Sequence, residues 1–181
     1  MTSLKAFTPF LAQQLVVTPA TLYERQRVLI PAGLLKAVKG RGPGTGVRLT
    51  GGSVSMLLVS IMASDLLKES GEITGRFARL VPETGKCIVS GRKSLLDALS
   101  AVLTSTELAG TFGDLLIERN GIGAVLWDAQ NKNGTNFLER NFKQPILGLN
   151  TSVRMPKRVL NNIAREMIKA LDRNSEERRS R

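Results

Sequence analysis

The sequence predicts an α+β fold, in which two short helices and a glycine-rich β-hairpin precede a helix-rich α+β domain with a small antiparallel sheet. Three observations favour this fold. Thr-Pro pairs at 8–9 and 18–19 each mark a helix start. Four glycines and a proline fall within the eight residues 39–46, which indicates a turn. Asn120-Gly121 lies between two apolar runs and is typical of a β-hairpin.

The composition narrows the function. With 181 residues, 42% of them hydrophobic, the chain can bury a core. No apolar run reaches the ~18 residues of a membrane span, and no secretory leader is recognisable, so we expect a cytoplasmic protein without membrane contact. The single cysteine, Cys87, excludes an internal disulfide and is expected to be a small buried hydrophobe. The chain has no histidine and no catalytic or metal motif, so we expect neither an enzyme nor a cofactor or metal site.

The positive charge is concentrated at the two ends of the chain. Residues 1–50 hold seven basic and one acidic residue, a net charge of +6, and residues 151–181 hold nine and four, a net charge of +5. Residues 51–100, with six and five, and 101–150, with four and five, nearly cancel. Basic ends beside a helical hairpin favour a polyanion as partner.

The first helix is predicted from Pro9 to Leu15, after a frayed lead-in, with Thr8 as its N-cap. The second is predicted to run from Pro19, capped by Thr18, to about 31–32. Two capped helices this close together indicate a sharp helical hairpin.

The second helix has two faces at helical spacing. Leu22, Gln26 and Leu29 are expected to pack on the first helix. The opposite face carries Ala20, Thr21, Tyr23, Glu24 and Arg27. Gly33 is suited to a left-handed C-cap, and residues 34–38 and 47–50 are expected as strands around the basic turn. The turn lacks the spacing of a nucleotide-binding loop.

Residues 8–50 resemble the winged helix-turn-helix domain of bacterial and phage transcription regulators. The stretch ATLYERQRVLIPAGLLKAVKGRGPGTGVRLT is similar to their recognition helix, its exit, the basic wing and the closing strand. The chain departs from the pattern at Val16, where glycine is usual in the turn, and at Gln26, where an aliphatic residue is usual. The resemblance implies a sequence-specific regulator of transcription that binds double-stranded DNA, and one short helix reads so few base pairs that a homodimer is expected.

The candidate DNA-binding residues fall into two groups. Those expected to face base edges are Thr21, Glu24 and Arg27. Those expected to face phosphates are Thr18, Tyr23, Arg25, Lys36, Lys39, Arg41 and Arg48.

The remainder, 51–172, is expected to form an α+β oligomerisation or effector domain. A helix over 53–70, apolar on nearly every side, is expected to connect the domains and to dimerise. A second helix, expected to start at 90 or 91 and to run to 109, precedes hairpin strands at 115–119 and 122–127, and one or two more strands are expected within 137–153. A terminal helix follows Pro156, and residues 173–181 are expected to be a disordered basic tail.

Three other interpretations stay open at this stage. The helical hairpin could be the scaffold of a protein-interaction module that binds polymerase or a phage or host component. The C-terminal domain could sense a small molecule, although no residue pattern names a ligand. The basic residues of the terminal helix could form a second DNA contact or simply a solvated face.

Overall fold

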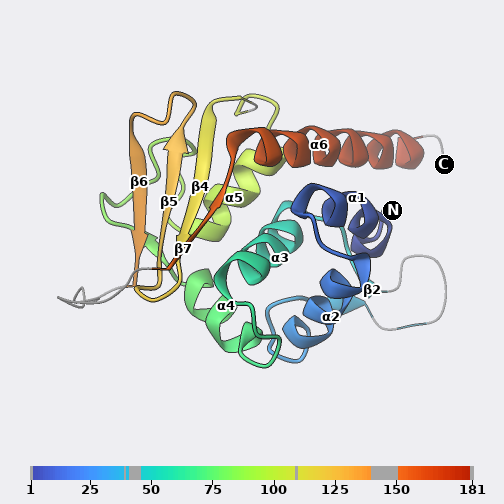
Figure 1. Cartoon of the computed structure of the whole chain (residues 1–181). Coiled ribbons are helices and arrows are strands. Elements are labelled where there is room, and N and C mark those ends of the chain that lie inside the picture. Colours follow the sequence, from blue (N-terminus) through green and yellow to red (C-terminus); the bar gives the residue numbers. More distant parts are fainter. Residues whose placement is uncertain (1, 39, 41–45, 109, 140–150, 180–181) are drawn as a thin grey trace.

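The computed structural model describes residues 2–38, 40, 46–108, 110–139 and 151–179, with side chains up to residue 173. Within these residues the chain forms six helices, a two-stranded sheet and a five-stranded antiparallel sheet, which confirms an α+β fold with a small antiparallel sheet. Figure 1 shows the larger sheet on one side of the molecule and the helices on the other. No helix in the described part is long and apolar enough to cross a membrane.

Helix α1 spans Leu4–Leu15, so the predicted start at Pro9 is wrong. Ser3 is the N-cap, and its hydroxyl accepts the Ala6 N–H at 3.2 Å. The lead-in is held in place because the Leu49 N–H donates to the Thr2 carbonyl at 3.2 Å. Pro9 therefore lies inside the helix, where it removes one backbone donor.

Val16 ends α1 in a left-handed conformation, with φ 55° and ψ 43°. This backbone conformation is usually adopted by glycine, and here a β-branched residue adopts it. The Val17 N–H donates to the Ala12 carbonyl at 3.0 Å and closes the turn. Helix α2, Pro19–Leu29, then starts as predicted, with the Thr18 hydroxyl accepting the Thr21 N–H at 3.1 Å.

Helix α2 ends at Leu29, two to three residues earlier than predicted. The Leu29 carbonyl accepts the N–H groups of Leu34 and Leu35 at 3.0 and 3.2 Å, which turns the chain back. Gly33 has the predicted positive φ, 74°. The β1–β2 hairpin follows, with Ala37–Val38 antiparallel to Gly46–Val47, and its strands are shorter than predicted.

Helix α3 spans Gly51–Ala63 and begins with a capping box between Thr50 and Ser53. The predicted continuation to residue 70 is wrong, because Ser64 is extended and α4 spans Ser70–Ala78. Nearly all of α3 is buried against α2, α4, α5 and the sheet. Helix α3 therefore connects the N-terminal helices to the rest of the chain, and its buried surface is not available for contact with a second copy.

The five-stranded sheet is antiparallel throughout, in the order β3-β6-β5-β4-β7. Strands β4 and β5 are the predicted hairpin around Asn120-Gly121, although pairing stops at Glu118 and Gly123, so the loop is longer than two residues. The strand bounds are Val81–Pro82 (β3), Phe112–Glu118 (β4), Gly123–Asp128 (β5), Gly134–Leu138 (β6) and Ser152–Met155 (β7).

Helices α5, Leu95–Thr104, and α6, Lys157–Arg179, complete the fold. The helix predicted from 90 or 91 to 109 is shorter, because Ser94 caps its start and Ser105, which is extended, ends it. The predicted disordered tail is wrong as far as Arg179, which still belongs to α6. One hydrophobic core, which includes Cys87, runs through both predicted domains, 1–50 and 51–172, so these two parts pack as one unit.

Candidate nucleic-acid interface

The three side chains predicted to read bases lie together on the outer side of α2. Thr21 and Arg27 are exposed and Glu24 is half-exposed. They face outward because Leu22, Gln26 and Leu29 are buried on the opposite side. Arg27 forms an ion pair with Glu24 at 3.2 Å. Such an exposed pair contributes roughly 0.2–1 kcal/mol, so it can open without large cost.

The first turn of α2 is exposed from Thr18 to Thr21. The two threonine hydroxyls lie 2.9 Å apart, in addition to the Thr18 cap on the Thr21 N–H. Tyr23, two residues after Thr21, is 48% exposed. A helix N-terminus flanked by hydroxyl groups favours an anion.

Gln26 departs from the winged-helix pattern, and the structure shows what this residue does. It is buried, and its Nε2 donates to the Thr8 hydroxyl of α1 at 3.2 Å. The Thr8 hydroxyl in turn donates to the Leu4 carbonyl at 2.9 Å. This polar chain satisfies the buried amide and hydroxyl groups and fixes α2 on α1.

Arg25, predicted to face a phosphate, is buried instead, with 5% of its surface exposed. Its guanidinium donates to the carbonyls of Ser60 at 3.1 Å, Ser64 at 2.8 Å and Asp65 at 3.1 Å. Burial lowers the pKa of Arg25, and the neighbouring Asp65 partly offsets this effect. Arg25 therefore caps the C-terminal end of α3, where a cation is favourable, and is not part of the outer surface.

Arg119, from the β4–β5 loop, caps the same end of α3. Its Nε donates to the Met62 carbonyl at 2.7 Å, and its two terminal nitrogens pair with the Asp65 carboxylate. The hydrogen bonds from Arg119 lower the pKa of Asp65. Arg25 of α2 and Arg119 of the β4–β5 loop thus both bind the C-terminal end of α3 and connect these elements through it.

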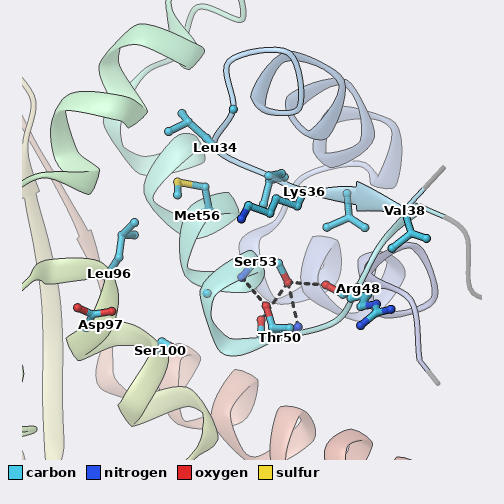
Figure 2. A pocket seen from close by; sticks show the side chains of 14 residues that line it. Leu34, Lys36, Val38, Arg48, Thr50, Ser53, Met56, Leu96, Asp97 and Ser100 are labelled. Atoms are coloured by element: carbon cyan, nitrogen blue, oxygen red, sulfur yellow. Dashed lines mark hydrogen bonds between the residues drawn. The ribbon is translucent and has the colours of Figure 1, made fainter.

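The β1–β2 hairpin contributes the remaining candidates. Lys36 and Arg48 are exposed on its two sides, whereas Lys39 and Arg41 lie outside the described residues. Figure 2 shows the Lys36 side chain extended toward Met56, over a cavity, while the Arg48 side chain points away from Met56. Both residues line the edge of this cavity, and the exposed Arg48 is also available on the outer surface.

Helix α6 carries a row of exposed cations at Arg158, Arg165, Lys169 and Arg173. Their separations of seven, four and four residues place them on one face of the helix. The helix is held beside α1, because Asn162 Nδ2 donates to Gln14 Oε1 at 3.1 Å. The two basic ends of the chain are thus in contact in the folded molecule.

The structure offers no metal site among its described residues, since no three acidic or cysteine side chains gather there. Comparison of the chain with protein-family models, curated proteins and solved structures found no match.

Proposed function

We propose that the protein is a sequence-specific regulator that binds double-stranded DNA through α2 and the β1–β2 hairpin. The observation that carries this proposal is the exposed face of α2, whose N-terminus is capped and which lies beside a basic hairpin. The positive charge of the sequence is also concentrated at its two ends. The short left-handed turn at Val16 supports the proposal, because a tight turn between two helices is what a helix-turn-helix requires.

In this proposal α2 enters the major groove. Thr21, Glu24 and Arg27 face base edges, since arginine pairs with guanine and a carboxylate accepts from cytosine. Thr18, Tyr23 and Arg48 contact phosphates and set the position of the helix. Arg25 supports α2 from behind by its bonds to α3.

We also propose that two copies act together on one DNA site, because a single short helix reads too few base pairs for a specific site. The contact between the copies has to use a surface other than α3.

Substitutions at Arg27 and Arg48 distinguish contacts to DNA bases from contacts to the DNA backbone. Arg27→Ala should weaken binding to a preferred duplex by about 1–3 kcal/mol and relax the preference at one base position. Arg48→Ala should weaken every duplex and reduce the slope of log affinity against log salt by about 0.9 per lost phosphate contact. Fluorescence anisotropy over a salt series measures both, with the exposed Arg92→Ala as control. Equal losses on preferred and random duplexes for Arg27→Ala would contradict base reading.

A protein-interaction module is the second candidate, favoured by exposed apolar side chains around the same helix. Val16, Tyr23, Ile30 and Val38 are 91%, 48%, 36% and 40% exposed. Apolar groups of this kind suit a protein partner better than a phosphate backbone. If Tyr23→Ala and Ile30→Ser abolish capture of a purified partner, such as an RNA polymerase, while the wild-type protein binds no duplex at low salt, the interaction module replaces DNA binding.

A further inference from the structure

A cavity of about 610 Å³ lies between the β1–β2 hairpin, the first turns of α3 and the start of α5. Figure 2 shows its walls. Three segments far apart in the sequence supply its apolar lining, which consists of Leu34, Leu35, Val38, Val47, Met56 and Leu96. A volume within about 300–1,000 Å³ and a mainly aliphatic lining are typical of sites for small molecules.

The charged side chains that line the cavity differ in the partners they have. Lys36, from the hairpin, forms no ion pair among the described residues. Asp97, from the opposite wall, accepts the Ser94 hydroxyl at 2.7 Å, and its own N–H donates to the same hydroxyl oxygen at 3.1 Å. The Asp97 carboxylate therefore serves the N-terminus of α5, where a negative charge is favourable. Arg48 also lines the cavity, so two cations and one carboxylate face it, and the lining carries a net positive charge.

We propose that this cavity binds a small carboxylate with an aliphatic body. The Lys36 ammonium pairs with the carboxylate at the hairpin side, and the body lies against Leu34, Met56 and Leu96. A carboxylate fits better than an amine, because the lining presents two cations, Lys36 and Arg48, against the single carboxylate of Asp97, which already accepts the Ser94 hydroxyl. The ligand would touch both the hairpin and α5 and so join the N-terminal helices to the rest of the chain. This inference does not depend on DNA binding.

The experiment compares octanoate with octylamine and octanol, each below its micelle concentration or solubility limit, by titration calorimetry and by methyl NMR of the intact protein. Octanoate should bind saturably and more tightly than the other two, and the Met56 methyl signal should shift. Lys36→Met keeps the alkyl stem and should reduce the preference for octanoate over octanol. Lys132→Met, on a distant exposed loop, is the matched control and should leave that preference unchanged.

Leu96→Trp and Leu34→Trp fill the cavity from its two sides, and each should weaken all three ligands by about tenfold or more, an estimate from the lost apolar burial. Circular dichroism identifies a tryptophan variant that fails to fold. The other tryptophan variant then tests whether filling the cavity weakens binding. The proposal is overturned if octanoate does not bind saturably, if octylamine binds as tightly, or if the folded tryptophan variants bind like the wild type. These measurements contain no DNA, so a failure of octanoate binding does not bear on the proposed DNA binding. A failure of DNA binding likewise does not bear on octanoate binding.

Discussion

At the scale of single residues, Val16 has a strained backbone conformation, and the packing of its side chain does not offset this strain. Its φ of 55° is unfavourable for a β-branched residue, and its side chain is 91% exposed, so little packing depends on it. The strain is held by the α1–α2 turn, which the Val17 N–H closes on Ala12.

Val16→Gly should therefore raise the free energy of unfolding by about 1 kcal/mol, because glycine adopts this conformation without steric cost. Urea denaturation measures the change. Val17→Gly is the matched control, since Val17 has no positive φ and packs on the core, and it should lower stability. A loss of stability in both variants would mean that the turn is not strained.

Asp114 is a buried carboxylate that holds the start of α6. It accepts the Lys157 N–H at 2.6 Å and Arg154 Nε at 2.5 Å. Burial raises the pKa of Asp114, but the hydrogen bonds from Lys157, Arg154 and Asn131 together outweigh it, so the net pKa lies below the usual value. A lowered folded-state pKa contributes stability above the unfolded-state pKa of about 3.9, and this contribution is lost as the pH falls through the folded-state value.

Asp114→Asn should lower the free energy of unfolding by about 1–3 kcal/mol at neutral pH, since a charged hydrogen-bond acceptor is lost. The difference from the wild type should shrink as the pH falls below about 4. Denaturation at a series of pH values measures it, with the exposed Glu107→Gln as control. A difference that stays constant down to low pH would show that the charge of Asp114 is unimportant.

The residues of α2 show what a local pattern can predict. The Thr18 cap and the buried face with Gln26 follow from neighbours within one or two helical turns, and both were predicted. Arg25 was misplaced because its partners, the carbonyls of Ser60 and Ser64, lie 35 and 39 residues away in the sequence. The cavity beside the β1–β2 hairpin could not be predicted for the same reason, since its α5 wall at Leu96 and Asp97 lies about 40 residues further along the chain than Met56.

At the scale of helices and strands, apolar runs predicted where elements lie better than where they end. The run after Ala63 continues into Leu66 and Leu67, yet both are exposed, because Ser64 is extended and ends α3. Helix α1 starts after Ser3, whose side chain caps it locally, whereas the residue before it is held by the Leu49 N–H, a contact that no local pattern contains.

The adjacent glycines at the start of α3 differ sharply in their surroundings. A Cβ at Gly51 would lie 2.9 Å from the Ser100 carbonyl oxygen and 2.8 Å from a Thr104 methyl carbon of α5, whereas at Gly52 it would meet only the Thr50 hydroxyl at 3.9 Å. The first glycine thus allows α3 and α5 to approach closely, and the second does not have this role.

Gly51→Ala should lower the free energy of unfolding by about 1–3 kcal/mol through overpacking. Gly52→Ala should leave it unchanged or raise it by up to about 1 kcal/mol, because alanine favours the helix. Thermal and urea denaturation of the pair give the comparison. Similar effects of the two substitutions would contradict the close packing of α3 on α5.

At the scale of the whole molecule, the fold unites the two basic ends of the sequence. Figure 1 shows α1, α2, β2 and the end of α6 on the side away from the larger sheet. The net charges of +6 over residues 1–50 and +5 over 151–181 were visible in the sequence, but their proximity follows only from the packing of α6 on α1. A polyanion could contact both segments at once.

Selection of bound duplexes from random DNA, with the mass of the complex measured in solution, tests the proposed function most directly. We predict an enriched palindrome whose half-sites lie about 10–10.5 base pairs apart, or a multiple of this, bound by two copies of the chain. The Arg27→Ala protein should select a different or degenerate base at one position in each half-site. A folded wild-type protein that enriches no sequence would contradict the proposed function.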